Sequence, residues 1–424
     1  MPEIKNMATR RSLLIQALQV AATAAVPGLP LGLLAGVQAQ APQQSAPRQD
    51  DMTLNSAPQQ ARYPPPDFGP PPAVLPASAL AIRGHNSLKE HGRRNDLLVG
   101  AAVVVRVLEN DPALQQLVSE QYGILVPEAE LKWRTLRPSA TTYDFAASDA
   151  LFAFAAAHRM QVRGHTLLWH NSVPDWLSAE PSRFNVRQLL VEHIQTVMGR
   201  YRGRVHSWDV VNEAILPADS QPGGLRKSFW YDAVGADYID LAYRTARIAD
   251  PHAQLAYNDY GVEYDSDENA ERRKCILALL RRMVEQEVPL DAVGIQSHIH
   301  AASPYAIGRG LTDYIEAIRT MGLKVYLTEL DVNEDDVPYD DVARRDQAVA
   351  AAYREFLRIA LANPAVKLLL TWGVSDRRTW LNDGPTHHRK QPNRPQRSLP
   401  FDPEYNPTPA FFTMRESFDQ RSSM

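Results

Sequence analysis

Two glutamates follow runs of apolar, β-branched residues, and they are the first candidates for chemistry in the sequence. Glu213 comes directly after Asn212 in the stretch SWDVVNEA, and Glu329 ends the stretch LKVYLTE. A carboxylate at the end of a buried strand is desolvated at a cost unless neighbouring groups compensate for it. Two such carboxyl groups facing each other suit cleavage of a glycosidic bond, with one as nucleophile and the other as acid and then base.

Further polar and aromatic residues stand where other predicted strands end. They are Glu128, Glu130, Lys132 and Trp133; His165, Trp169 and His170; Asn258, Asp259 and Tyr260; Gln296, His298 and His300; Asp331; and Trp372. Aromatic rings that line an open cleft stack on the apolar faces of sugars, while polar groups bind the hydroxyls. The set contains no Ser-His nucleophile elbow and no cofactor loop, so we expect no cofactor.

The elements that position these residues alternate strictly between strand and helix from about residue 85. The predicted strands are 97–105, 122–127, 160–169, 204–211, 253–259, 290–297, 323–329 and 366–372. Helical periodicity is clear in 144–160, 187–203 and 340–363, where apolar residues recur every third or fourth position. Eight such units predict an α/β fold with a single (β/α)8 TIM barrel, whose active-site groups lie at the carboxyl ends of the strands. The alternative, an open doubly wound sheet, lacks its usual glycine-rich loop after the first strand.

Six motifs in order resemble glycoside hydrolase family 10, the endo-1,4-β-xylanases. The motifs are VRGHTLLWH, WDVVNEA, YNDYGVE, GIQSHIH, LTELDV and TWGVSDRRTW, and the resemblance spans about residues 88–415. It implies a retaining enzyme that cuts internal bonds of xylan or xylo-oligosaccharides. It also implies Glu329 as the nucleophile and Glu213 as the acid and base, whose pKa burial would raise.

The resemblance assigns substrate-binding and supporting roles as well. Asn212 would bind the 2-hydroxyl of the cleaved sugar, while His298 and Asp331 would hold Glu329 ionised. The sugar on the non-reducing side would meet Lys132, His165 and Trp169, with aromatic walls from the C-terminal part of the barrel. The complete set of expected supporting residues is Glu128, Lys132, His165, Trp169, His170, Asn212, Tyr260, Gln296, His298, Asp331, Trp372 and Trp380.

Two features depart from the family pattern. Ala129 in PEAELKW stands where the family usually has an asparagine that binds the second sugar from the cut. A lost neutral hydrogen bond costs about 0.5–1.5 kcal/mol, so we expect weaker or altered binding rather than lost chemistry. The basic segment 381–398 is longer than usual, and it is either a solvated loop or an extra wall that meets acidic side groups of the substrate.

The N-terminal part has the composition of an export signal and a linker. Residues 1–39 have a basic start, a weakly apolar middle and a small-residue end at Ala39, and Arg10-Arg11 resembles a twin-arginine signal. A general secretory signal is the alternative. Residues 40–80 are rich in Pro and Gln and predict a disordered tether, which leaves 81–424 as the catalytic domain. We therefore expect export to the periplasm or the cell exterior.

The composition gives no reason to expect other partners. The formal net charge is −4, so neither nucleic acid nor a membrane surface is indicated, and we expect a monomer. A single cysteine excludes an intrachain disulfide, and we expect no metal site. Three alternatives stay open: a β-1,4-glucanase or mixed-specificity enzyme, a metal-dependent barrel hydrolase that uses the histidines, and a sugar-binding barrel without turnover.

Overall fold

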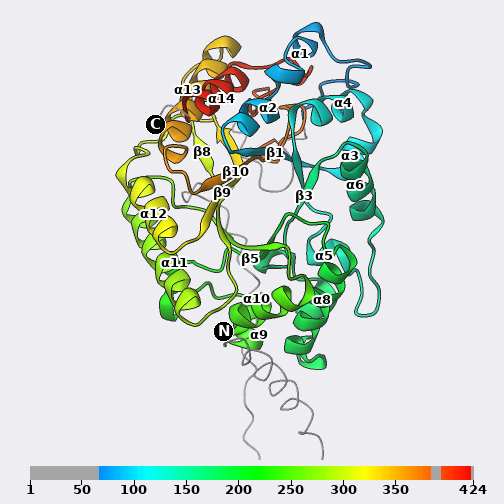
Figure 1. The fold of residues 1–424 in the computed structure, drawn as a ribbon, viewed down its shortest axis with the longest axis vertical. Coiled ribbons are helices and arrows are strands. Elements are labelled where there is room, and N and C mark those ends of the chain that lie inside the picture. The colour runs from blue at the N-terminus through cyan, green and yellow to red at the C-terminus, as the bar shows by residue number, and fades with distance from the viewer. Residues whose placement is uncertain (1–65, 383–392, 422–424) are drawn as a thin grey trace, which may run out of the picture. The chain divides into compact units, whose positions relative to one another are not determined.

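The computed structural model describes residues 66–382 and 393–421. Its centre is a closed barrel of eight parallel strands, in which each strand pairs with the next and the last pairs with the first (Figure 1). The barrel strands are β1 (Leu98–Val103), β2 (Ile124–Pro127), β3 (Gln161–Gly164), β5 (Ser207–Asn212), β6 (Gln254–Asp259), β7 (Ala292–Ile295), β9 (Lys324–Asn333) and β10 (Val366–Thr371). The predicted (β/α)8 barrel is confirmed, and each predicted strand has its counterpart.

Two predicted strands are interrupted near their carboxyl ends. The chain leaves the sheet after β3 and returns as β4 (Leu168–Trp169), which pairs with the end of β5. It also leaves after β7 and returns as β8 (His298–His300), which pairs with the end of β9. At the second break Ser297 has a φ of 67°, outside the extended region, and its N–H donates to the Glu263 carboxylate at 3.1 Å. The breaks fall beside His165 and Gln296, so they set where these side chains stand.

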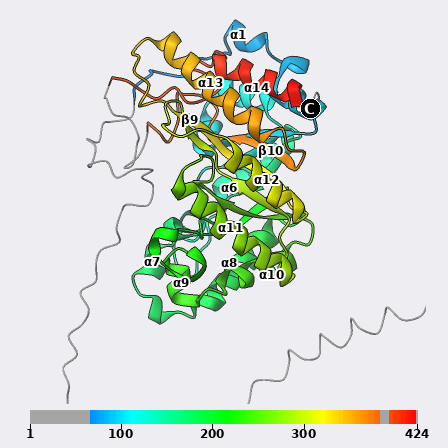
Figure 2. The ribbon, with the colours of Figure 1, turned by 90° about the vertical axis from the view of Figure 1, so that its left-hand side faces the viewer.

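The helices form a layer outside the strands (Figures 1 and 2). They are α1 (Ala77–Leu80), α2 (Leu88–Arg94), α3 (Val105–Asn110), α4 (Pro112–Gln121), α5 (Trp133–Leu136), α6 (Ala146–Ala157), α7 (Asp175–Ser178), α8 (Val186–Arg200), α9 (Phe229–Val234), α10 (Tyr238–Ala249), α11 (Asp267–Glu285), α12 (Arg309–Thr320), α13 (Val342–Ala360) and α14 (Pro409–Gln420). Short 3₁₀ turns lie at η1 (Gly84–Asn86), η2 (His170–Ser172), η3 (Pro181–Arg183), η4 (Pro217–Asp219) and η5 (Pro222–Gly224). Within the described residues, every helix is too short or too polar to cross a membrane.

Local sequence explains where the long helices begin and which face they bury. The side chain of Asp341 accepts a hydrogen bond from the Arg344 N–H at 2.9 Å and so caps α13. Along α13 the residues Val349, Tyr353 and Phe356 recur at helical spacing and are buried against the strands. The helix predicted over 340–363 is therefore present, as are those over 144–160 and 187–203.

Apolar side chains fill both sides of the strand layer. The larger cluster packs between the strands and the surrounding helices. A smaller cluster that includes Ile124, Val126, Tyr326 and Leu368 lies inside the barrel and closes it below the strand ends. Because both faces of each strand are covered, the strands read as nearly continuous apolar runs, and the polar residues are confined to their ends.

The folded part begins earlier than predicted. Leu75 and Ala79 are buried in the core, although they fall in the predicted linker 40–80. Small apolar residues between prolines do pack here, so the predicted domain boundary at residue 81 is corrected to before Leu75. The predicted export signal 1–39 and the linker up to residue 65 lie outside the described residues.

Candidate active site

Glu213 stands one residue past β5 in an unusual backbone conformation. Its φ is 58°, a value that side-chain-bearing residues adopt at a cost. Two hydrogen bonds of its backbone groups hold Glu213 in this conformation. The Glu213 N–H donates to the Asn258 carbonyl at 2.9 Å, and Arg226 Nε donates to the Glu213 carbonyl at 2.8 Å. This conformation is imposed by the surroundings, as at sites where a side chain has to point in one direction.

The Glu213 carboxyl accepts three hydrogen bonds from neutral side chains. Trp169 Nε1 donates to Oε2 at 2.7 Å, while Asn212 Nδ2 and Gln296 Nε2 donate to Oε1 at 3.0 and 2.9 Å. The ring of His170 is also near, with Nδ1 at 3.7 Å from Oε2. These groups come from three different parts of the chain, and all of them favour the ionised carboxylate.

The pKa of Glu213 is consequently lower than its ordinary value, opposite to the sequence-based expectation. Burial raises this pKa most strongly of any single cause, and the positive charges of His170 and Arg226 lower it. The hydrogen bonds from Gln296 and Trp169 act in the same direction. The expectation was wrong because it counted burial and missed the charges and hydrogen-bond donors that the fold brings from other parts of the chain.

Glu329 lies within β9 and is also buried. Asn258 Nδ2 donates to its Oε1 at 2.7 Å, and His298 Nε2 lies 3.3 Å from its Oε2. Burial raises the pKa of Glu329, but the hydrogen bond and charge of His298, the charge of His165 and the Asn258 bond lower it to about 2. Glu329 is therefore a carboxylate at any ordinary pH.

A chain of polar contacts continues behind Glu329. His298 Nδ1 lies 2.8 Å from Asp331 Oδ1, and Trp380 Nε1 donates to Asp331 Oδ2 at 2.6 Å. Burial lowers the pKa of His298, but the adjoining Asp331 and Glu329 carboxylates raise it to about 10. A protonated His298 between two carboxylates fixes the orientation of Glu329.

Asn258 joins the two glutamates and was absent from the predicted set. Its Nδ2 donates both to Glu329 Oε1 and to Asn212 Oδ1, the latter at 2.8 Å, and its Oδ1 accepts from Thr328 Oγ1 at 2.7 Å. Gly294 makes room for it, because a Cβ there would lie 2.1 Å from the Asn258 oxygen. The strand-end pattern did include Asn258, but no further signal in the sequence separated it from its neighbours.

On one side of the glutamates, aromatic rings surround a lysine. Lys132 Nζ lies 4.5 Å from the centre of the Trp169 ring and 5.9 Å from that of Trp372. The Trp372 ring also meets His165 edge-on, with 5.3 Å between the ring centres. Burial lowers the pKa of Lys132, while the charge of Glu329 opposes this lowering. These four residues form a wall that combines ring faces with polar hydrogens, as a sugar requires.

His165 is oriented by groups that sequence reasoning missed. Its Nδ1 lies 2.9 Å from Asp209 Oδ2, and the other oxygen of Asp209 pairs with Arg163. All three side chains are buried, and they come from β5 and from the end of β3. A buried Asp in the middle of the predicted strand 204–211 was the available signal, because such a residue needs a charged partner.

Tyr260 lies on the opposite side, next to Glu213. Arg226 Nη2 donates to the Tyr260 hydroxyl at 3.1 Å while its Nε holds the Glu213 carbonyl. The Arg272 guanidinium covers the Tyr260 ring at 4.3 Å. Arg226, another residue missing from the prediction, thus couples the position of Tyr260 to that of Glu213.

Two neighbours of the site are structural. Glu130 Oε1 accepts from the Val105 N–H at 2.8 Å, which joins the loop after β2 to α3. Trp133 is buried and stacks on His193, with 3.8 Å between the ring centres. Glu128 follows β2 at the rim of the site, and Ala129 beside it is exposed. Trp169, His170, Asn212, Gln296 and His298 lie directly beside one of the two glutamates, and Lys132, Tyr260 and Asp331 reach them through one neighbour.

The basic segment 381–398 is described only in part, since 383–392 lie outside the described residues. Arg394 is buried and donates to the Val337 carbonyl at 2.7 Å, and it also meets Glu334 at 3.3 Å. Arg397 pairs with Asp346 at 2.5 Å. These two arginines are therefore paired within the protein, so neither a solvated loop nor a wall of substrate-binding cations describes residues 393–398.

Histidines and carboxylates do not gather into a metal site in 66–382 and 393–421. These ranges hold no group of three or more His, Cys, Asp or Glu side chains arranged to bind a metal ion. His165 and His298 each face a carboxylate that is already part of the network described above.

Known proteins resemble this chain along almost the whole barrel. The sequence profile described as Glycosyl hydrolase family 10 matches residues 87–417. Endo-1,4-beta-xylanase B of Thermotoga neapolitana is 34% identical over 309 residues, which cover 72% of this chain and 83% of that protein. The native xylanase 10B of Thermotoga maritima aligns with a TM-score of 0.69 and 30% identity, covering 80% of this chain and 100% of its own. Xylanase 10B of Thermotoga petrophila RKU-1, solved in complex with xylobiose, aligns with a TM-score of 0.68 and 29% identity. The alignment covers 79% of this chain and 97% of that protein's chain.

Proposed function

The chain belongs to glycosyl hydrolase family 10, and from this membership and its paired glutamates we propose that it is a retaining endo-1,4-β-xylanase. It hydrolyses internal β-1,4-xylosidic bonds of xylan in two displacements. The single observation that carries the proposal is the network in which Asn258 and Asn212 link Glu329, whose pKa is lowered to about 2, to Glu213.

In the first displacement a Glu329 oxygen attacks the anomeric carbon. A carbon–oxygen bond to Glu329 forms, the bond to the leaving sugar breaks, and Glu213 donates its proton to the leaving oxygen. In the second, Glu213 takes a proton from water, the water oxygen attacks the same carbon, and Glu329 leaves as a carboxylate. Two inversions give net retention of the β-configuration.

The lowered pKa of Glu213 fits the second step directly and requires a change for the first. A leaving-group oxygen at Oε2 occupies the place to which Trp169 Nε1 now donates, at 2.7 Å. Loss of that donor and exclusion of water both raise the pKa of Glu213 towards the value that an acid needs. Once Glu329 becomes a neutral ester its repulsion disappears, and Glu213 becomes a carboxylate suited to act as base.

The surrounding residues bind and orient the sugars in this proposal. Asn212 donates to the 2-hydroxyl of the cleaved sugar, and Gln296 holds Glu213 in place. Lys132, Trp169 and Trp372 contact the sugar on the non-reducing side. The proposed set of supporting residues also includes Glu128, His165, His170, Tyr260, His298, Asp331 and Trp380. The arrangement of Trp169, His298, Asp331, Tyr260 and Lys132 supports these roles, because each lies within one or two contacts of a catalytic glutamate.

The rate of new reducing-end formation on xylan, compared with a β-1,4-glucan at equal mass concentration, tests the proposal. We expect rapid release from xylan and little from the glucan. Glu329→Ala is the matched control, and it should lower the rate on xylan by several powers of ten. Preferential release from the glucan would favour the glucanase alternative. No release from either polymer, with retained binding, would favour a sugar-binding barrel.

We also propose that the protein is exported and acts as a monomer. The support for export is the basic, then apolar, then small-residue pattern of residues 1–39. Separation of periplasm, medium and cytoplasm of expressing cells tests this, and replacement of Arg10-Arg11 by lysines distinguishes a twin-arginine route from general secretion. Light scattering of the purified protein measures its oligomeric state.

A further inference from the structure

The wall that surrounds Lys132 continues outward from the two glutamates to Glu128. Burial lowers the pKa of Lys132, and the charges of Glu329, Glu128, Glu213 and Glu130 all oppose that lowering, so Glu128 acts on the same lysine as the two catalytic glutamates. A sugar that meets Lys132 and the Trp372 ring is the first one beyond the cut. Glu128 directly precedes Ala129, the position at which the family pattern binds the second sugar from the cut, so we expect that sugar beside Glu128.

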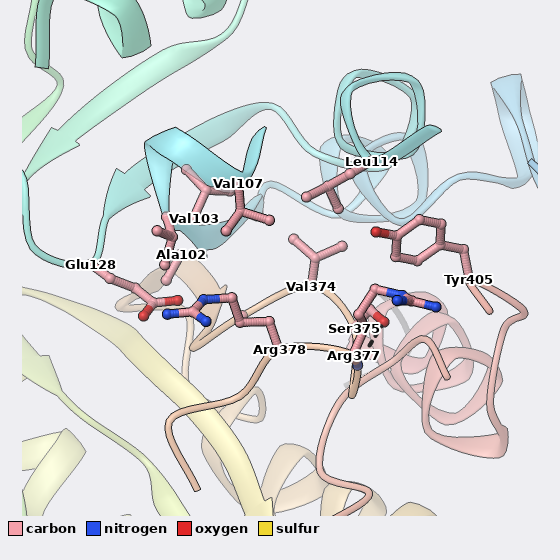
Figure 3. Close-up of a pocket in the computed structure, with 12 residues that line it drawn as sticks. Ala102, Val103, Val107, Leu114, Glu128, Val374, Ser375, Arg377, Arg378 and Tyr405 are labelled. Atoms are coloured by element: carbon pink, nitrogen blue, oxygen red, sulfur yellow. Dashed lines mark hydrogen bonds between the residues drawn. The ribbon is translucent and has the colours of Figure 1, made fainter. Parts of the chain in front are cut away.

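Arg378 faces Glu128 across the end of β1, the strand that lies between β10 and β2. Figure 3 shows its guanidinium pointing toward the Glu128 carboxylate, although the two residues follow β10 and β2 respectively. Arg378 is exposed, and its N–H donates to the Ser375 carbonyl at 3.0 Å. The neighbouring Arg377 fixes this turn, because it donates to the carbonyls of Pro403 and Gly69 at 2.7 and 2.8 Å. The guanidinium is therefore carried by a firmly held turn.

The pocket behind this pair does not itself hold a sugar. Its volume of about 40 Å³ has room for a few water molecules only, and Val103, Val107 and Leu114 form its walls (Figure 3). Two further polar side chains in its lining are committed to the protein: Ser375 Oγ donates to the Asp402 carbonyl, and the Tyr405 hydroxyl pairs with Asp111. A sugar at the rim thus meets the Arg378 and Glu128 pair.

The chemistry of the rim requires a donor that residue 129 does not provide. An ionised Glu128 accepts hydrogen bonds only, whereas sugar hydroxyls both donate and accept. Ala129 is exposed and offers a methyl group, and its N–H already donates to Glu130 Oε2 at 3.2 Å. Arg378 brings a planar guanidinium with N–H donors to the same place.

We propose that Arg378 is the residue that donates hydrogen bonds to the second sugar on the non-reducing side, with Glu128 as acceptor, in place of a polar side chain at position 129. The proposal rests on the proposed xylanase function. It makes Arg378 a determinant of specificity for substrates with two or more sugars on that side of the cut.

Two aryl glycosides separate this role from the chemistry. 4-Nitrophenyl β-xyloside places one sugar on the non-reducing side and 4-nitrophenyl β-xylobioside places two. For Arg378→Ala, we expect the ratio of kcat/KM on the xylobioside to kcat/KM on the xyloside to fall about ten-fold or more, as for a lost hydrogen bond from a charged donor. Arg319→Ala, which removes an exposed arginine paired with Glu316 at the far end of α12, is the matched control and should leave the ratio unchanged. An unchanged ratio in a folded Arg378→Ala protein would overturn the proposal.

Restoring an amide tests the substitution between the two positions. In the Arg378→Ala background, Ala129→Asn should recover most of the lost ratio, because it returns a donor beside Glu128. No recovery would show that Arg378 does not stand in for residue 129. The rate of the wild type on xylan distinguishes failure of this inference from failure of the proposed function. An active wild type with an unchanged kcat/KM ratio in Arg378→Ala contradicts this inference alone. A wild type without activity on xylan contradicts the proposed function.

Discussion

Replacing Asn258 by alanine perturbs the contact that joins the two glutamates. Asn258 is fully buried, and its Nδ2 is the donor to Glu329 Oε1 at 2.7 Å. A hydrogen bond to a charged group contributes about 1.5–3 kcal/mol, and one pKa unit corresponds to about 1.36 kcal/mol. The pKa of Glu329, now about 2, should therefore rise by about one to two units in Asn258→Ala. The Thr328 hydroxyl keeps a partner in the Ile295 carbonyl at 3.2 Å, so no donor is left unpaired.

The pH dependence of kcat/KM on 4-nitrophenyl β-xylobioside measures this shift. The activated leaving group needs no proton, so the acid limb reports ionisation of the nucleophile in the free enzyme. We expect the acid limb of the kcat/KM profile of Asn258→Ala to lie about one to two pH units above that of the wild type. Gln121→Ala, which removes a buried amide bonded to Leu88 and Ile82 far from the site, should lose stability without moving the limb. If the acid limb lies at the same pH in the wild type and in a folded Asn258→Ala protein, Asn258 does not lower the pKa of Glu329.

Three further predictions concern the same pair of carboxyl groups. Glu213→Ala should impair hydrolysis of xylan far more than that of 4-nitrophenyl xylobioside, since only the former needs a proton on the leaving group, and equal losses on both would contradict this role. Trp169→Phe removes the donor to Glu213 Oε2 and should raise the pKa of Glu213. The basic limb of the kcat/KM profile on xylan should therefore move to higher pH. A basic limb at the wild-type pH would contradict the role of Trp169 in lowering this pKa. Glu329 has a folded-state pKa of about 2 against 4.5 ordinarily, so its stabilisation is present above pH 4.5 and is lost as the pH falls towards 2. The Tm difference between the wild type and Glu329→Gln should therefore narrow between pH 5 and 3, and a constant difference would contradict this.

The fold and most of the site could be predicted because strand ends in a parallel barrel meet at one edge. The alternation of apolar runs placed Glu213 and Glu329 correctly, and the same pattern brought His165 and Trp372 beside them. Spacing along the chain does not show which side chains touch. The donors to Glu213 come from β4, β5 and the break after β7, so the direction of its pKa shift depended on a convergence that no single stretch displays.

Other differences have equally local causes. Asn258 follows the same strand-end pattern as Tyr260, but its role depends on Gly294 in the next strand leaving space for its amide. Leu75 and Ala79 were assigned to a linker because prolines surround them, whereas burial of a few small apolar groups is enough to order that segment. The sequence left Arg394 and Arg397 as candidates for substrate binding because their partners, Glu334 and Asp346, precede them by about fifty residues or more.

The most direct test of the central claim is a proton NMR time course of xylohexaose hydrolysis by the purified protein. Attack by Glu329 followed by attack of water retains the configuration, so the first products should come from internal cuts and carry the β-anomer, with the α-anomer appearing later by mutarotation. Early α-anomer would contradict a covalent intermediate on Glu329. Intact xylohexaose after prolonged incubation would contradict the assignment of an endo-xylanase altogether.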